Sequence, residues 1–383
     1  MTLKSDIDVQ EYGALIQAAL NAKLTTEDST YNHVINTQLF DDKLLVWLNE
    51  PSETIMNIDF KNAVEQIVAP LLFPGFVVKF KPGLNLVERP NEPPESSRAL
   101  IYHLHHGKYA RLLINNINDD TQLFESKSGN LGIKLMNPDF FWFPRNGSNH
   151  MALQAVTQAG KTSFLTFLLP NLKGFSQLEI KRGAIDDGVN ELVVIDPKID
   201  PHLREESMRL RADYIYPEID KSDYSFINDV NTQLGQMIDL IKRRAEILKD
   251  QPKTKFKDVW VIIDEGLAIP EMANTKSKNI YFSFLDRLLL MSASTQIHII
   301  LTGQAFNAGQ IVSSFARLQF SLRILMTPKV TVENSQYLFK SLDESSINNL
   351  IIDEDKYGSL GVGIITNGDG QILPFKAPFL EGI

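Results

Sequence analysis

Gly160, Lys161 and Thr162 are the residues with the clearest capacity for chemistry, because they follow an apolar run and precede a helical pattern over residues 163–169. In a strand–loop–helix setting, backbone N–H groups and the helix N-terminus cradle phosphate oxygens. The lysine then reaches the β- and γ-phosphates of a nucleotide, and the threonine hydroxyl coordinates Mg²⁺. Ala155 stands where the full P-loop pattern has its first glycine. We therefore predict an ATP site formed by Ala155, Thr157, Gln158, Ala159, Gly160, Lys161, Thr162 and Ser163.

A second motif, Asp264-Glu265, follows the apolar run at residues 259–263. A carboxylate at the end of a buried strand can hold Mg²⁺ opposite a phosphate loop, so Asp264 is predicted to bind the metal together with Thr162. Glu265 is predicted to orient or deprotonate the attacking water. Considered alone, the pair fits a solvated acidic turn equally well. Together with the phosphate loop, the catalytic interpretation is favoured.

Polar residues also follow two other predicted strands. Asp196-Pro197-Lys198 ends one of them, and Gln304 follows the run at residues 297–303, where a side chain can sense a γ-phosphate or position water. Such residues are commonly just caps. Arginines that could stabilise charge on a phosphoryl group of a neighbouring subunit are Arg287, Arg317 and Arg323, and Arg317 is taken as the catalytic candidate. For each arginine alone, an ordinary salt bridge is the alternative.

These residues need a framework of parallel strands. Apolar runs alternate with helical segments from about residue 150, which predicts a mostly parallel sheet covered by helices. Together with the phosphate-loop motif, this predicts an α/β P-loop NTPase domain over residues 147–383, which the family resemblance given below identifies as a motor domain. Residues 1–146 lack this alternation. They contain two helical patterns and several short strand patterns, and they are predicted to form a smaller α+β domain in front of it. A chain of 383 residues is long enough for two domains.

Composition restricts the possible functions. The chain has no cysteine, which excludes disulfides, thiolate metal sites and cysteine nucleophiles. Its formal net charge of −9 argues against a dedicated nucleic-acid coat, although a few local loops could still grip DNA. No apolar run approaches the roughly 20 residues of a membrane span, and the N-terminus lacks the apolar region of a signal peptide. We expect a cytoplasmic protein that reaches a membrane only through partners.

The order of these motifs resembles a known family, the FtsK/SpoIIIE-type DNA translocases of the FtsK–HerA group of ring ATPases. The resemblance covers about residues 130–376 and depends most on Asp196-Pro197-Lys198 and on the His298-containing strand that leads to Gln304. Departures are Ala155, Gly303 where the family usually has threonine, and Ala305-Phe306 where it has Arg-Pro. Compact motors of this kind, without a membrane segment or a C-terminal winged helix, resemble those of plasmids and conjugative elements.

The resemblance implies Mg²⁺-dependent ATP hydrolysis by a ring, a hexamer in this family, coupled to movement along double-stranded DNA in plasmid or conjugative transfer or processing. It also implies a relaxase or membrane transfer machinery as further partners. DNA contacts are expected in pore loops near residues 200–204 or near residues 304–310. The basic stretch at residues 242–257 fits DNA or subunit contact and a solvated helix end equally well. Two alternatives remain open: a secretion or genome-packaging ATPase of the same group, and a slow module that binds ATP as a switch.

Overall fold

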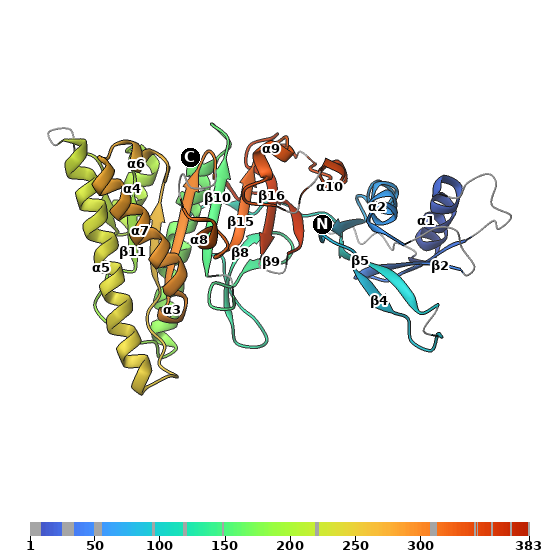
Figure 1. The fold of residues 1–383 in the computed structure, drawn as a ribbon, viewed down its shortest axis with the longest axis horizontal. Coiled ribbons are helices and arrows are strands. Elements are labelled where there is room, and N and C mark those ends of the chain that lie inside the picture. Colours follow the sequence, from blue (N-terminus) through green and yellow to red (C-terminus); the bar gives the residue numbers. More distant parts are fainter. Residues whose placement is uncertain are drawn as a thin grey trace.

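The computed structural model of the chain describes residues 9–24, 34–49, 56–93, 96–117, 121–147, 149–218, 222–306, 312–340, 342, 344–353, 355–367 and 370–381. A smaller N-terminal body and a larger body lie side by side along the long axis of the molecule (Figure 1). The expected contacts at residues 307–310 lie outside these ranges. Among the described helices, none is both long and apolar enough to cross a lipid bilayer.

The N-terminal body is an antiparallel sheet with two helices packed on it (Figure 1). Its strands are β1 (Ile35–Leu39), β2 (Lys43–Leu48), β5 (Arg98–His106) and β3 (Phe76–Lys79) in that order, with β4 (Leu86–Glu88) also paired to β5. The helices are α1 (Val9–Leu24) and α2 (Ile58–Leu72). A core of its own, including Ile16, Leu20, Val64, Val68 and Leu100, holds this body together.

The larger body is built on an eight-stranded sheet with the order β12-β11-β13-β14-β10-β15-β16-β17. The first six strands in this order are parallel, and the last two are antiparallel. This confirms the predicted α/β fold class. The bounds are β10 (His150–Ala155), β11 (Leu192–Ile195), β12 (Asp213–Ile215), β13 (Val259–Ile263), β14 (Ile297–Gly303), β15 (Phe320–Met326), β16 (Val362–Asn367) and β17 (Ile372–Lys376).

Helices cover both faces of this sheet, which explains why its central strands are apolar at every position. Side chains alternate along a strand, so successive residues face opposite helical layers. The helices are α3 (Lys161–Lys181), α4 (Pro201–Arg209), α5 (Asp223–Asp250), α6 (Ala268–Glu271), α7 (Thr275–Met291), α8 (Ser314–Arg317), α9 (Val332–Ser335), α10 (Glu344–Asn348) and the 3₁₀ turn Ala293–Thr295. In β13, Val261 packs in the core that includes α5 and α7, whereas Trp260 packs in the core that includes α3 and α4.

The hydrophobic cores divide the chain earlier than the sequence analysis does. Residues of β8 (Leu131–Met136) and β9 (Phe140–Trp142), which form a small sheet with β7 (Leu123–Glu125), share a core with α3 of the larger body. The strand β6 (Leu113–Ile114) pairs with β18 (Phe379–Leu380) near the end of the described chain. We therefore place the change of domain near Gly107 instead of residue 146. The sequence of the short strands before residue 146 does not show which helices they pack against, so the boundary could not be placed from the sequence.

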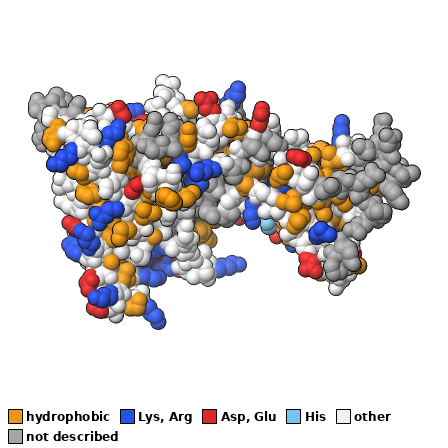
Figure 2. Space-filling view, in the orientation of Figure 1, with side chains coloured by type: hydrophobic (Ala, Val, Ile, Leu, Met, Phe, Trp, Pro, Cys, Tyr) orange, Lys and Arg blue, Asp and Glu red, His pale blue; other side chains and the backbone are white. Residues whose placement is uncertain are grey.

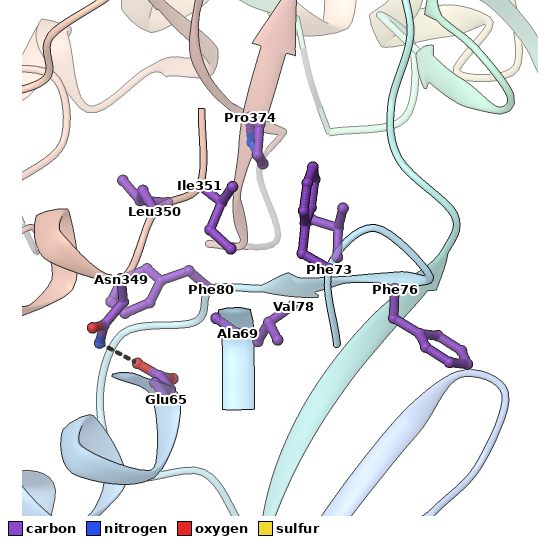
Figure 3. Close-up of a pocket in the computed structure, with 11 residues that line it drawn as sticks. Glu65, Ala69, Phe73, Phe76, Val78, Phe80, Asn349, Leu350, Ile351 and Pro374 are labelled. Atoms are coloured by element: carbon purple, nitrogen blue, oxygen red, sulfur yellow. Dashed lines mark hydrogen bonds between the residues drawn. The ribbon is translucent and has the colours of Figure 1, made fainter. Parts of the chain in front are cut away.

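A segment that we name the strap, residues 349–353 and 355–361, joins the two bodies. Figure 3 shows its first residues facing α2 and β3, with Asn349 directed at Glu65. The Asn349 amide donates to the Glu65 carboxylate at 3.4 Å, and Leu350 and Ile351 line a cavity of about 20 Å³ with Pro374. A cavity of this size holds about one water molecule, so it is a packing gap and not a ligand site.

Ion pairs fix the middle of the strap. Asp353 Oδ2 lies 3.3 Å from Lys108 Nζ and 2.9 Å from Lys376 Nζ. Asp355 Oδ2 accepts a hydrogen bond from Nε of the buried Arg111 at 2.7 Å. These charges tie the middle of the strap to the larger body, whereas Asn349 ties its beginning to the N-terminal body.

Arg244 lies in the core and not on a DNA-facing surface. Its side chain is 1% exposed, Nε donates to Asp187 Oδ2 at 2.8 Å, and Nη1 donates to the Thr295 carbonyl at 2.6 Å. Arg243, the preceding residue on α5, is exposed. Of the two arginines in the basic stretch, only Arg243 is therefore available for contact with DNA or a second subunit.

We expect Arg244→Ala to lower the free energy of unfolding by about 2–3 kcal/mol, because it leaves a carboxylate and a buried carbonyl without their charged donor. The matched variant Arg243→Ala should change it by less than about 0.5 kcal/mol. Urea unfolding followed by far-ultraviolet circular dichroism measures both values. Equal losses in the two variants would contradict this assignment.

Candidate functional site

The phosphate loop lies between β10 and α3, as its sequence predicts. Gly160 is the N-cap of α3 with φ +86°, a left-handed conformation that glycine adopts without strain. The N–H groups of the first turn of α3 therefore face the loop. Ala155 continues β10 in register with Met326 and is buried. The missing first glycine is thus replaced by an ordinary strand residue, and alanine is accommodated at this position.

The loop forms one wall of a cavity of about 490 Å³. This volume lies within the range of small-molecule sites, about 300–1,000 Å³. Every proposed ATP-binding, metal-binding and catalytic residue lines it except Arg317. The complete set of lining residues is Ala155, Val156, Thr157, Gln158, Ala159, Gly160, Lys161, Thr162, Ser163, Lys198, Ile199, Asp200, Pro201, Asp264, Glu265, Gln304 and Leu360.

Lys161 connects the two motifs that the sequence analysis singled out. Its ammonium lies 2.7 Å from Asp264 Oδ1 and 2.6 Å from Glu265 Oε1. Burial lowers the pKa of Lys161, but the two carboxylates outweigh burial and raise it above its ordinary value. Burial raises the pKa of Glu265, whereas the ammonium groups of Lys161 and Lys198 lower it by more. The site therefore holds a charged lysine and a charged glutamate at neutral pH.

Thr302, which the sequence analysis did not select, orients both acidic residues. Its hydroxyl donates to Asp264 Oδ1 at 2.6 Å and accepts the Glu265 backbone N–H at 3.3 Å. Glu265 itself has φ +46°, a conformation that is uncommon outside glycine and that is often found at functional sites. Thr302 could have been selected from the sequence because it stands two residues before Gln304, near the end of β14.

Hydroxyl and carboxylate oxygens line the cavity beside Thr162. The Thr162 hydroxyl donates to Asp200 Oδ2 at 3.3 Å, and Asp264 lines the same cavity. Hydroxyl and carboxylate oxygens are the donors that Mg²⁺ prefers, with water or phosphate oxygens completing its shell. Thr162 and Asp264 therefore fit the predicted metal role, and Asp200 is an additional acidic neighbour. The expected DNA-contact residues 200–204 begin α4, with Asp200 as its N-cap.

The turn at residues 196–200 is held by the buried Asp196. Its Oδ1 atom accepts hydrogen bonds from the backbone N–H groups of Lys198 and Ile199. Its Oδ2 atom accepts one from the backbone N–H of Asp200 and one from the Tyr214 hydroxyl. All four distances are 2.8–3.0 Å. The fixed turn carries Lys198 to the cavity, where its Nζ lies 3.1 Å from Glu265 Oε1. The sequence indicated the importance of this motif but not its contact with Glu265.

The end of the strap closes the cavity beside the phosphate loop. Leu360 lines the wall next to Gly160, and the Gly361 N–H donates to the Ala159 carbonyl at 3.0 Å. A smaller hollow continues from Gly160 and Ser163 past Leu360 towards Phe379. Nothing in the sequence linked residue 360 to residue 160.

Arg317 lies elsewhere in this chain. Its side chain is buried, Nη1 donates to the Phe306 carbonyl at 3.4 Å, and the guanidinium lies 5.8 Å from the centroid of the Tyr337 ring. Arg323 is also held by backbone carbonyls, whereas Arg287 is exposed on α7. None of the three arginines lines the cavity of its own chain.

No family model and no curated protein matches the chain. Solved structures that resemble it include the pCW3 conjugation coupling protein TcpA in a monomer form with ATPγS, at 14% identity over 96% of this chain and 95% of that one, with a TM-score of 0.49. The cytoplasmic domain of the Thermomonospora curvata type VII secretion ATPase EccC is 13% identical over 72% of this chain and 29% of that one, with a TM-score of 0.43.

A third similar structure is the genome packaging NTPase B204 from Sulfolobus turreted icosahedral virus 2 in complex with sulfate. It is 14% identical over 62% of this chain and 99% of that one, with a TM-score of 0.36. The likeness is one of fold.

Proposed function

We propose that this chain is a Mg²⁺-dependent ATPase that moves double-stranded DNA as a ring, with plasmid or conjugative DNA transfer or processing as its setting. The observation that carries the ATPase proposal is the position of the Lys161 ammonium between Asp264 and Glu265, inside a cavity bounded by a phosphate loop. A cation, a metal-binding carboxylate and a candidate base thus meet at the carboxyl ends of parallel strands, where α/β sheets bind ligands.

In the proposed reaction, ATP and water give ADP and phosphate. Lys161 leaves the carboxylates for the β- and γ-phosphates. Thr162, Asp264 and their neighbour Asp200 would hold Mg²⁺, which would neutralise phosphate charge there. Glu265 accepts a proton from water as the water oxygen bonds to the γ-phosphorus and the bond to the bridging oxygen of ADP breaks. Gln304, across the cavity, positions the water or the γ-phosphate. The proton then passes to solvent.

Arg317 is proposed to act on the nucleotide of a neighbouring subunit, which requires a ring and a change in its present burial. An arginine on the transferring phosphoryl group stabilises charge in the transition state. The exposed Arg287 is an alternative for the same role. A ring would thus provide a group that the cavity of one chain lacks within the described residues.

The DNA part of the proposal is supported by the family resemblance of the sequence motifs. On the face drawn in Figure 2, Lys and Arg side chains are interspersed with acidic and hydrophobic ones and form no continuous basic stripe. With a net charge of −9, the attraction to DNA must come from local groups focused in a pore. Action in the cytoplasm, with recruitment by a relaxase or by membrane machinery, belongs to the same proposal.

The test is ATPase rate with and without linear duplex DNA, with molecular mass measured in parallel by light scattering. We expect duplex DNA of any sequence to raise the rate several-fold, and we expect DNA binding to weaken steeply as salt increases. A protein that remains monomeric with ATP and duplex DNA and shows no stimulation would favour the slow nucleotide switch. Stimulation by a protein cargo instead of DNA would favour a secretion ATPase, whereas a genome-packaging motor would share the DNA dependence.

A further inference from the structure

Lys198 contacts the same oxygen of Glu265 that Lys161 contacts. The distances to Glu265 Oε1 are 3.1 Å from Lys198 Nζ and 2.6 Å from Lys161 Nζ. Two cations on one oxygen lie within two hydrogen-bond lengths of each other. The proposed mechanism uses Lys161 and Glu265 but assigns nothing to Lys198, although it lines the same cavity.

The backbone that carries Lys198 is fixed, whereas its ammonium is free to move. Asp196 accepts the N–H groups of residues 198, 199 and 200, and these three hydrogen bonds hold the turn. The Lys198 side chain is 51% exposed, and Glu265 is its ion-pair partner in the structure. A flexible stem on a rigid base allows an ammonium to exchange one anion for another without any change in the fold.

Lys198 lies in the part of the cavity where the γ-phosphate of a bound nucleoside triphosphate is expected. The smaller hollow shares Gly160, Ser163 and Leu360 with this cavity, and neither Lys198 nor Glu265 lines it. A nucleotide whose β- and γ-phosphates meet Lys161 would bring its γ-phosphate beside Lys198, because both ammonium groups contact the same Glu265 oxygen. A diphosphate lacks this group.

We propose that Lys198 recognises the γ-phosphate and, by leaving Glu265 for it, frees the Glu265 carboxylate to act on the attacking water. This inference rests on the proposed ATPase function. Before the triphosphate binds, the ion pair with Lys198 balances the negative charge of the Glu265 carboxylate. A γ-phosphate carries more negative charge than the carboxylate does, so the ammonium moves to it. ADP leaves the pair intact. Lys198 would thus make the site respond to triphosphate and not to diphosphate.

The experiment measures the affinities of the full chain for a fluorescent non-hydrolysable ATP analogue and for fluorescent ADP, both with Mg²⁺. Lys198→Ala should weaken triphosphate binding roughly 10- to 100-fold and leave ADP binding unchanged, because one charge-assisted contact is lost only with the γ-phosphate. Lys198→Arg should retain most of the preference. Lys23→Ala, which removes an exposed lysine on α1 of the N-terminal body, is the charge-matched control and should change neither affinity.

A second measurement tests the release of Glu265. In Glu265→Gln the ion pair is absent, so Lys198 is free before nucleotide binds and the triphosphate preference should rise. Lys198→Ala should then cost more triphosphate affinity in the Glu265→Gln background than in the wild type. If the effects of the two substitutions on triphosphate affinity are additive, Lys198 and Glu265 are not coupled, and the release step is overturned.

The outcomes separate this inference from the ATPase proposal. If the wild type binds both nucleotides and Lys161→Ala abolishes both, the site is established. Equal effects of Lys198→Ala on ATP and ADP affinity, or no effect on either, would then overturn the role of Lys198 alone. If the wild type binds neither nucleotide, the proposed function fails and this inference fails with it.

Discussion

Lys161→Ala is expected to reduce ATP affinity and the ATPase rate by more than about 100-fold, because it removes the cation that faces the phosphates in a partly enclosed cavity. The fold should persist, since Lys161 contacts Asp264 and Glu265 in that cavity and is not part of either hydrophobic core of the larger body. Nucleotide binding is measured by fluorescence titration, and folding by circular dichroism of the same samples.

The control for charge is Lys161→Arg. It retains a cation between the two carboxylates, so its stability should stay near that of the wild type. It should still lose ATP turnover, because a planar guanidinium cannot replace a compact ammonium inside a phosphate loop. A Lys161→Ala protein that hydrolyses ATP at nearly the wild-type rate would disprove the assignment of the phosphate loop.

The second large effect distinguishes the two acidic residues of β13 and the turn after it. Glu265→Gln should lower kcat by about 100- to 10,000-fold while ATP remains bound, because only the group that receives the water proton is lost. Asp264→Asn should instead weaken the binding of Mg²⁺-ATP, because it removes a negative charge beside the metal and alters the carboxylate that Thr302 orients.

Single-turnover hydrolysis measures the rate of the chemical step, and nucleotide retention on a desalting column measures how well each variant holds nucleotide. We expect Glu265→Gln to retain intact ATP and Asp264→Asn to retain little nucleotide of any kind. Normal turnover in Glu265→Gln would move the role of base to another carboxylate, with the buried Asp196 as the next candidate. Identical behaviour of the two variants would contradict the assignment of metal binding to Asp264 and of proton acceptance to Glu265.

Local patterns predicted the framework of the site. The phosphate loop, the buried strands and the acidic pair each consist of a few consecutive residues whose spacing reflects one strand and one turn, so periodicity and motif were enough to place them. Lys161, Asp264 and Glu265 meet in the structure because parallel strands bring their carboxyl ends to one edge of the sheet. That conclusion required only the order of the elements.

Contacts across the chain could not be predicted in the same way. The link from Thr302 to Asp264 and the link from Lys198 to Glu265 depend on which strands are neighbours and on side-chain directions. Arg244 resembled surface charge because it stands in a run of basic residues, and its burial depends on the position of Asp187 in a distant loop. The true roles of such residues are set by tertiary packing, which composition and periodicity do not encode.

The strap has a practical consequence for anyone who divides this protein into parts. A fragment beginning near residue 147 would remove Lys108 and Arg111, and Asp353 would keep only Lys376 as its cation while Asp355 would lose its guanidinium. The same cut would expose Leu350 and Ile351 to water, only a few residues before Leu360 meets the phosphate loop. Nucleotide affinities or rates measured on such a fragment would describe a cavity with a loosened wall, and weak activity in it would say little about the full chain.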